Sequence, residues 1–437
     1  MAWEFMLLLI VGSLIVLMAT GLPVAFCFMV VNVIGVFLFW GGGIGLEQLT
    51  LSIFESVTQW ALVPMPLFIL MGSVMFHSGM APRMIDALDK WLGRLPGRLG
   101  LLAVGAGTLL SSLTGDSMSS VAMLGSTLVP EMEKRGYKKS MSLGPILGSG
   151  GLAIMVPPSA LAILLGAIGQ ISVGGILIAI IIPGLLMATL YAAYIIVRCW
   201  LQPSIAPPYK VAAIPILDKI TATMRYVLPL GFIVFLVVGV IFLGIATPSE
   251  AAASGALGSF ILAAAYRKLN WHVINKSILA TLRISIMMLI IITGAKAFAQ
   301  ILAYTGASRG LIELASGLSI TPILIIAAMM FVVLILGTFM DLVSIMMITL
   351  PIYVPVIRSL GFDPVWFAVL MLLNIEVATT SPPFGLSLFV MKGVAPPDTT
   401  MGDIYRAGLP FIYCDLIAMA LIITFPAIAL WLPHLMR

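Results

Sequence analysis

The chain has 437 residues, of which 61% are hydrophobic and only 9% are charged, and its mean hydropathy is +1.19. No soluble domain can bury that much apolar surface, so the composition predicts an all-α polytopic protein that crosses the lipid bilayer several times. The net charge of +5 comes from Lys and Arg in the connections, which indicates membrane topology rather than nucleic-acid binding. Three isolated cysteines and three histidines form no metal-ligand or disulfide pattern, so we expect no cofactor.

Taken in order, the apolar segments and their breaks predict a first unit over residues 1–210. Its expected parts are two scaffold spans, a stretch along the membrane interface, a third span, a hairpin, a broken span and a fifth span. We place them at residues 5–20, 24–40, 46–60, from 64 onward, about 99–130, 143–170 and 176–198.

The hairpin at about 99–130 centres on a polar run, Ser111–Ser120, which contains a single carboxylate, Asp116. The apolar arm on either side has little more than half of the roughly 20 residues that a helix needs to cross a bilayer. Basic residues close both outer ends. This pattern predicts a re-entrant hairpin with Asp116 buried at membrane depth.

Two small-residue clusters, Gly148–Gly151 and Val156–Ser159, interrupt the span at 143–170. Glycines and a proline pair inside an apolar segment favour a helix that is broken in the middle. Such a break leaves backbone carbonyls unpaired, which is tolerated only where protein, ions or water satisfy them.

A second unit is predicted over residues 226–437. Its spans lie at 227–245, 251–266 and 278–304, followed by a hairpin at about 321–358, a broken span at 365–390 and a last span at 409–432. The hairpin tip runs from Gly337 to Ser344 and contains Asp341. The whole chain is thus expected to have about ten transmembrane helices and two re-entrant hairpins.

The two units align when the sequence is shifted by 225 positions. Asp116 then falls on Asp341, and Pro157–Pro158 falls on Pro382–Pro383. Five spans separate the hairpins, and this odd number predicts that they enter from opposite faces as an inverted repeat. Basic residues place the first hairpin on the cytoplasmic side and both termini outside. Inverted repeats with broken helices are typical of secondary transporters.

Asp116 and Asp341 admit two interpretations. A carboxylate inside the membrane costs about 2.5–3.5 kcal/mol on insertion scales unless a cation or donor meets it, which favours a cation site. The alternative is a helix cap, since Asp and Ser are favoured at that position, and the two roles can coexist. Hydroxyl and carbonyl oxygens at the tips and breaks would complete a sodium site, among them Thr114, Gly115, Ser344 and Thr379.

The half-helices that begin at these breaks point partial positive charge inward, which suits a carboxylate substrate. The substrate-binding candidates are Ser149, Gly150, Pro157, Ser159, Ser381 and Lys296. Lys296 could be the counter-charge to a carboxylate or to substrate. For single Ser and Thr residues, helix packing is the alternative. Glu376, near the second break, could be a gate or a structural pair, and Glu250 is expected to be a helix cap.

Several stretches together resemble the large membrane subunit of tripartite ATP-independent periplasmic (TRAP) transporters, the DctM-like family. They are Thr20–Phe26, Gly115–Ser120 continuing to Pro130 and Gly136-Tyr137, Ala246–Ala252, and Ser381–Gly385. The resemblance implies an elevator-type fold of the ion transporter superfamily, driven by a sodium gradient. It implies as partners a small four-helix membrane subunit and a periplasmic binding protein that delivers an organic acid, at the bacterial inner membrane. It also carries over eight sodium-site candidates, namely Ser112, Asp116, Ser119, Gly337, Thr338, Asp341, Thr380 and Pro382.

The main alternative is a stand-alone sodium-coupled dicarboxylate symporter or antiporter of related two-hairpin architecture. An intramembrane enzyme is disfavoured, because Ser112 and Ser119 have no nearby histidine base and no metal cluster is visible. No phosphate-binding Walker A sequence is present, so ATP is not the expected energy source. A scaffold role remains open, and a channel would not require two inverted hairpins.

Overall fold

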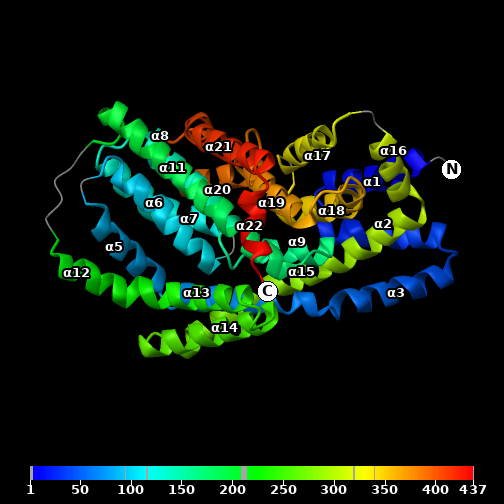
Figure 1. Cartoon of the computed structure of the whole chain (residues 1–437), viewed down its shortest axis with the longest axis horizontal. Helices are drawn as coiled ribbons and strands as arrows, with labels where there is room; N and C mark the ends of the chain where they lie inside the picture. Colours follow the sequence, from blue (N-terminus) through cyan, green and yellow to red (C-terminus); the bar gives the residue numbers. More distant parts are fainter. Residues whose placement is uncertain are drawn as a thin grey trace.

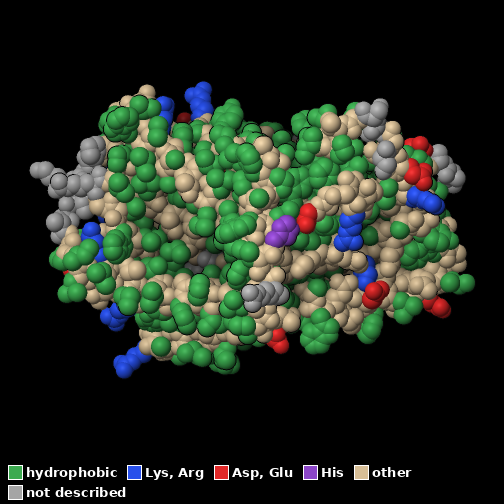
Figure 2. All heavy atoms as spheres, in the orientation of Figure 1, with side chains coloured by type: hydrophobic (Ala, Val, Ile, Leu, Met, Phe, Trp, Pro, Cys, Tyr) green, Lys and Arg blue, Asp and Glu red, His purple; other side chains and the backbone are tan. Residues whose placement is uncertain are grey.

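The computed structural model describes residues 3–93, 95–114, 117–207, 214–317, 320–338 and 340–436, without the side chains of Ala81, residues 110–114 and Ser316. Within these ranges the regular secondary structure is entirely helical, which agrees with the predicted all-α class. Figure 1 shows an elongated arrangement in which the chain begins at one end and finishes near the middle. The face in Figure 2 is covered mostly by hydrophobic side chains, with few charged ones, as a membrane protein requires.

The first half of the chain contains the first hairpin and a pair of helices that meet at a bend. Its helices are α1 (Trp3–Ala19), α2 (Val24–Phe39), α3 (Gly43–Val57), η1 (Trp60–Leu62), α4 (Pro64–His77), α5 (Met80–Leu92), α6 (Arg98–Thr114), α7 (Ser117–Lys134), α8 (Lys139–Met155), α9 (Ala160–Gly169), α10 (Val173–Ala179), α11 (Ile181–Leu201) and η2 (Pro203–Ile205).

The second half repeats much of this order. Its helices are α12 (Ile216–Ala222), η3 (Thr223–Val227), α13 (Leu228–Phe242), α14 (Pro248–Ala265), α15 (Trp271–Tyr304), α16 (Ala307–Gly317), α17 (Pro322–Gly337), α18 (Leu342–Ser359), α19 (Pro364–Thr380), α20 (Leu386–Val394), α21 (Met401–Thr424) and α22 (Ala427–His434).

One group of helices, which we call the long-helix layer, consists of α2, α3, α4, α13, α14 and α15. The 34-residue helix α15 packs along α2, α3 and α4, and α4 packs in turn on α14. The α2–α15 contact is fixed by Asn32, whose buried Nδ2 donates to the Gly294 carbonyl at 2.7 Å. Large apolar side chains on the outside of this layer are exposed, Phe235 by 73%, as expected where a helix faces lipid or another membrane subunit.

Each predicted hairpin corresponds to two consecutive helices in the structure. The arms α6 and α7 pack on each other and on α8, while α17 and α18 pack on each other and on α19. The second arms reach across, because α7 also packs on α20 and α18 on α9. The helices α8 and α19 contact each other, so both hairpins are joined through this central pair.

Helix length and composition give fewer spans than we predicted. In the described part of the chain, six segments are long and apolar enough to cross a membrane, or seven if the α8–α9 pair, which is bent by 46°, counts as one span. Other predicted spans, such as Trp3–Ala19 and Val24–Phe39, form shorter apolar helices. The count of ten is therefore not confirmed, whereas the break that we predicted in the span at 143–170 is present between Met155 and Ala160.

The helix bounds keep the 225-residue spacing seen in the sequence. Adding 225 to the ends of α7 gives those of α18, and adding it to the ends of α8 gives those of α19. After α7 and α18 the chain turns at Gly136 and Gly361, with φ of 81° and 77°, a conformation that favours glycine. The same local instructions thus produce the same elements twice.

Candidate functional site

At the tip of the first hairpin, the structure describes side chains only on the α7 side. Gly115 and Asp116 lie outside the described residues, and Ser112 and Thr114 lie in the last turn of α6, where side chains are not described. Ser117, the first residue of α7, is fully buried, and its hydroxyl donates to Glu376 Oε1 of α19 at 3.5 Å. This contact joins the tip of the first hairpin to the centre of the fold.

Ser119 lies on another side of α7. Its side chain is exposed and lines a cavity of about 160 Å³ together with Gly72, His77 and Ala280 of α4 and α15. The structure therefore places this sodium-site candidate against the long-helix layer rather than against α19.

The tip of the second hairpin is ordered by Asp341. Its Oδ2 accepts hydrogen bonds from the backbone N–H groups of Val343 at 3.1 Å and Ser344 at 3.2 Å. The hydroxyl of the fully buried Ser344 donates to the other carboxyl oxygen, Oδ1. Capping of α18 is thus confirmed for Asp341, and a role in a cation site stays a prediction.

Gly337 and Thr338 end the first arm of this hairpin, α17. A Cβ atom added to Gly337 would lie 2.2 Å from the Cβ of Ala378 in α19, so only glycine allows this approach. The Thr338 hydroxyl donates to the Ile335 carbonyl at 2.7 Å. The second tip therefore contacts α19 at Ala378. The first tip contacts the same helix two residues earlier, at Glu376.

The end of α19 carries three buried hydroxyl groups, those of Thr379, Thr380 and Ser381. All three donate to backbone carbonyls of Glu376 or Val377, at 2.6 to 3.3 Å. Because each proton is directed to the helix, the hydroxyl oxygens keep lone pairs that can accept a hydrogen bond or bind a cation. Pro382 follows directly, in the break before α20.

Small residues on α8 make room for this junction. A Cβ atom on Gly150 would lie 2.4 Å from a Val121 methyl group of α7, and one on Gly151 would lie 2.6 Å from Glu376 Oε1. On the side toward α6, Ser149 is fully buried, its hydroxyl donates to the Ile146 carbonyl at 3.0 Å, and it lies against Gly107. Two substrate-site candidates, Ser149 and Gly150, thus belong to the segment that both hairpin 1 and α19 approach.

The remaining substrate-site candidates lie apart from one another. Ser159 caps α9 by accepting from the Ala162 N–H at 3.3 Å, and Pro157 lines an apolar cavity of about 430 Å³ toward α13. Ser381 is the exception, because it is one of the three hydroxyl residues at the end of α19. Lys296, in the second half of α15, forms an ion pair of 2.8 Å with Glu55 of α3 and lies on a different cavity from all of these.

Glu376 is the charged residue of this region and, like Ser117 and Gly151, it is not among the predicted sodium or substrate candidates. It is only 1% exposed, it accepts the Ser117 hydroxyl, and it packs on Gly151. Its signal in the sequence is that it is the one charged residue of α19. The structure thus brings Ser117, Gly150, Gly151, Gly337, Glu376 and the three α19 hydroxyls to one junction, which we call the tip junction.

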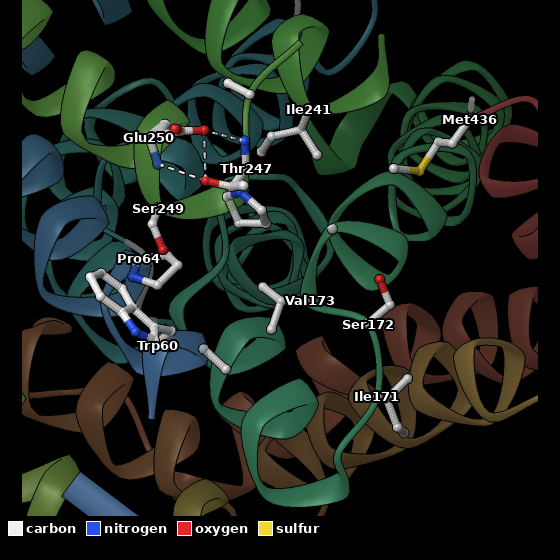
Figure 3. Close-up of a pocket in the computed structure, with 14 residues that line it drawn as sticks. Trp60, Pro64, Ile171, Ser172, Val173, Ile241, Thr247, Ser249, Glu250 and Met436 are labelled. Atoms are coloured by element: carbon white, nitrogen blue, oxygen red, sulfur yellow. Dashed lines mark hydrogen bonds between the residues drawn. The ribbon is translucent and has the colours of Figure 1, made fainter. Parts of the chain in front are cut away.

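A separate cavity of about 680 Å³ lies between the start of α4, the loop before α10 and the α13–α14 connection. Figure 3 shows Trp60 and Pro64 on one side of it and Ile171 and Ser172 on another. At its edge Thr247 and Glu250 form a reciprocal capping box on α14, so the predicted cap role of Glu250 is confirmed. None of the sodium or substrate candidates that the structure describes lines this cavity.

The tip junction offers hydroxyl, carbonyl and carboxylate oxygens but no cluster typical of a transition-metal site. Within the described ranges no group of three His, Cys, Asp or Glu side chains could hold a metal ion. Hard monovalent or divalent cations prefer oxygen ligands of the kind found here, and backbone carbonyls at helix breaks are a recurrent source of them. The junction therefore gathers oxygen atoms of the kind that such cations prefer.

Comparison with known proteins adds a family. A family model described as "Tripartite ATP-independent periplasmic transporter, DctM component" matches residues 11–428. The chain is 31% identical over 392 residues to the C4-dicarboxylate TRAP transporter large permease protein DctM of Pseudomonas aeruginosa, covering 89% of this chain and 90% of that protein. It is 28% identical to the isethionate TRAP transporter permease protein DctMQ of Oleidesulfovibrio alaskensis, covering 89% of this chain and 61% of that protein.

Solved structures with the same fold include the YdaH transporter of Alcanivorax borkumensis. The match has a TM-score of 0.64 and 15% sequence identity and covers 91% of each chain. At that identity the likeness concerns the fold alone, and it indicates that the arrangement of helices described above is one that a transporter can adopt.

Proposed function

The chain belongs to the DctM family of large permease components of TRAP transporters, and from this premise we propose that it imports an organic acid by coupling to a sodium gradient. The relatives are named as permeases, so the chain is a transporter component rather than an enzyme. The finer parts of the proposal are the coupling ion, the substrate class, the partners and the mode of movement.

The observation that carries the proposal is the tip junction. Ser117 of the first hairpin touches Glu376, and Gly337 of the second hairpin touches Ala378, so the two tips reach α19 within one helical turn. Because residues two positions apart face different sides of a helix, a cation bound at either tip would join that hairpin to α19. Its binding energy would then favour one arrangement of these elements, which is what coupling requires.

Sodium fits the groups available. The hydroxyls of Thr379, Thr380 and Ser381 donate to backbone carbonyls and leave oxygen lone pairs free for a cation. Asp341 uses two oxygens for capping, yet each carboxylate oxygen has further lone-pair capacity. We assign the undescribed tip residues Gly115 and Asp116 to the same site by the 225-residue correspondence with Asp341.

The proposed mechanism is an elevator. The hairpins, α8, α9, α19 and α20 would move as a unit against the long-helix layer, carrying ion and substrate from one side to the other. The support is that the hairpin arms pack on α8, α9, α19 and α20, and that α4 packs on α14 and α15. The two sets meet where α6 packs on α4 and α18 packs on α15, and these contacts would change during the movement. In this proposal the two halves of the chain, residues 1–210 and 226–437, are an inverted repeat.

The substrates named for the relatives differ, C4-dicarboxylate in one case and isethionate in another, but each compound carries at least one acidic group. We therefore propose an organic acid without naming it. A periplasmic binding protein would deliver it and a small four-helix membrane subunit would accompany the chain in the bacterial inner membrane. The relative named DctMQ supports a second membrane component, since the chain matches only 61% of it.

The first test is sodium binding by the purified chain. Because a ligand that binds only the folded state stabilises it, by about 2.7 kcal/mol at one hundred times its Kd, unfolding in NaCl is expected at a higher temperature than in KCl at equal ionic strength.

The second test is uptake of radiolabelled succinate and isethionate by proteoliposomes that contain the chain, its small subunit and its binding protein. Uptake is expected only with an inward sodium gradient.

Equal unfolding temperatures in the two salts, together with uptake that persists when potassium replaces sodium, would reject sodium coupling. Uptake by the chain alone, without the small subunit and binding protein, would instead favour the stand-alone symporter or antiporter. That alternative has no specific observation in its favour here, because the family that the chain matches is a component of TRAP transporters.

A further inference from the structure

A small cavity of about 80 Å³ lies on the seam between α15 and the pair α9 and α18. Three residues with polar side chains line it: Lys296 of α15, Gln59 at the start of η1 and Gln170, an exposed residue at the end of α9. The rest of its lining consists of alanine, isoleucine and proline side chains. A lysine and two glutamines therefore meet at an otherwise apolar, partly enclosed space between α15, η1, α9 and α18.

Lys296 is held there by a partner that can be displaced. Its Nζ lies 2.8 Å from Glu55 Oε1 of α3, and the Lys296 side chain is 17% exposed whereas that of Glu55 is 67% exposed. A carboxylate so open to water is well solvated on its own, so the ion pair is weak and a second anion can compete for the ammonium group. No other ion pair involves either residue in the described part of the chain.

Gln170 is positioned by α18, the second arm of the second hairpin. It ends α9 in a left-handed conformation, with φ of 50°, and its carbonyl accepts a hydrogen bond of 2.9 Å from Arg358 Nη2 at the end of α18. Arg358 is thus a positioning residue that ties Gln170 to the second hairpin. Any movement of α9 and α18 along α15 would separate Gln170 from Lys296 and Gln59. The three residues are therefore together in only one position of α9 and α18.

The size of the cavity selects a functional group rather than a whole molecule. At roughly 30 Å³ for each water, 80 Å³ holds two or three waters, which is the space of one carboxylate or sulfonate group. An ammonium group and two amides are donors suited to such an anion. An apolar lining raises the strength of each of these contacts by excluding water.

We propose that Lys296, Gln59 and Gln170 form a subsite for one acidic group of the substrate, with Glu55 as the internal anion that it displaces. The inference rests on the proposed import of an organic acid, and it adds an anion-selective position on the seam, apart from the tip junction. Because the subsite is shared between the long-helix layer and α9, it is complete only in the arrangement seen here. It would therefore receive the acidic group in one position of the transport cycle and lose it in the other.

The test uses a reporter cysteine that leaves all three groups in place. Ala299, half-buried on the lining of the cavity, is replaced by Cys, and the three natural cysteines, all buried, give the unsubstituted chain a low background. The full chain in proteoliposomes is treated with the anionic reagent sulfonatoethyl methanethiosulfonate or the cationic trimethylammonioethyl methanethiosulfonate. We expect the anionic reagent to react about tenfold faster, as a focused cationic site accelerates anion approach.

Two variants shift this ratio in opposite directions. With A299C as background, Lys296→Gln is expected to abolish the preference for the anionic reagent, and Glu55→Gln to increase it, because Lys296 loses its competitor. A misfolded protein cannot produce both results. The matched control is Arg309→Gln, which removes an exposed cation that is paired with Glu313 on α16 and should leave the ratio unchanged.

Sodium isethionate and sodium succinate, compared with sodium chloride, are expected to slow labelling of A299C when Lys296 is present. An unchanged ratio in K296Q, or a fall in E55Q equal to that in K296Q, would overturn the subsite. Equal protection by chloride would overturn its selectivity for acidic groups. None of these measurements uses a sodium gradient, so failure of the subsite and failure of sodium-coupled import are separate outcomes.

Discussion

At the scale of single residues, Asp341 has the cap role, one of the two interpretations that the sequence admits for it. Its carboxyl group accepts two backbone N–H groups and the Ser344 hydroxyl, which fixes the first turn of α18. The negative charge is not needed for this, since asparagine caps helices about as well as aspartate. The cap and the proposed cation role can therefore be separated by changing the charge without changing the shape.

Asp341→Asn should keep the folded state and lose the response to sodium. We expect its unfolding temperature in KCl to match that of the unsubstituted chain, whereas the added stability in NaCl falls. Asp341→Ala should in addition cost about 0.5–2 kcal/mol through the lost cap. The matched control is Asp363→Asn, because Asp363 caps α19 through the Val365 and Trp366 N–H groups at an exposed position. Sodium stabilisation retained in full by D341N would remove Asp341 from the ion site.

Gly337 tests the close approach of the second hairpin to α19. Because an added methyl group would lie 2.2 Å from the Ala378 Cβ, Gly337→Ala must push α17 away from α19. Overpacking of this kind costs typically about 1–3 kcal/mol, and we expect a lower unfolding temperature and reduced uptake. Gly393→Ala, at a glycine of α20 with no atom near the added Cβ, is the control. Equal stability of the two variants would contradict the described contact.

Residues differ in how far the sequence alone could identify them. Asp341 and Gly337 were identified because the polar tip, its flanking apolar arms and its repeat in the first half are local patterns. Glu376 was noticed but not assigned to the site, since its role depends on Ser117 and Gly151, which are more than 200 positions away in the chain. Lys296 was identified by its charge, whereas its partner Glu55 depends on how α3 packs on α15.

At the scale of elements, the small residues of α8 explain why this helix can lie at the centre. Gly144 and Gly148 face Phe411 of α21, Gly150 faces α7 and Gly151 faces Glu376 of α19. Four close approaches on one 17-residue helix leave little space for any side chain. The sequence predicts the break from the glycines of 148–151 and from the proline pair at 157–158. In the structure the break lies at the proline pair, between Met155 and Ala160, and the glycines serve packing along α8.

Some predicted elements differ in length from the helices of the structure. The segments α3, η1 and α4 correspond, at the 225-residue spacing, to the single helix α15. Two prolines, Pro64 and Pro66, follow the turn at Trp60–Leu62, whereas α15 contains none, so only the first half breaks there. The sequence predicted an interfacial stretch in the first half and a shorter span in the second, because apolar periodicity does not show where a helix continues through polar residues.

The pairing of α11 with α21 gives a prediction about stability away from the site. Tyr191, fully buried, donates its hydroxyl to the Asp415 carboxyl group, which is 2% exposed, and this is the one hydrogen bond that the described residues supply to that group. Tyr191→Phe leaves the carboxyl group without its donor, at a cost of about 1–3 kcal/mol. We expect a lower unfolding temperature with the sodium-induced shift intact. Tyr413→Phe, at a tyrosine of α21 that is 61% exposed, should have no effect.

At the scale of the whole molecule, the repeat places chemically different residues in equivalent positions. Glu376 occupies in the second half the place of Gly151 in the first, and the two touch. Duplication alone would have given either two carboxylates or two glycines at this contact. Two carboxylates would repel each other, so the observed pair puts one charge at the centre of a nearly symmetric arrangement. The proposed ion site is thus asymmetric even though the scaffold around it is repeated.

The last prediction tests whether the two halves of the chain have opposite orientations in the membrane. Lys134 and Ser359 are exposed, end α7 and α18, and are separated by the repeat spacing of 225. If the halves are inverted, these equivalent positions lie on opposite faces of the membrane, with Lys134 inside because basic residues cluster around it. A membrane-impermeant maleimide should then label Ser359→Cys in intact cells and Lys134→Cys only after the membrane is opened. The natural cysteines are buried and give the background. Labelling of both positions from the same side would require a parallel repeat, and the two hairpins could then not dip toward α19 from opposite leaflets.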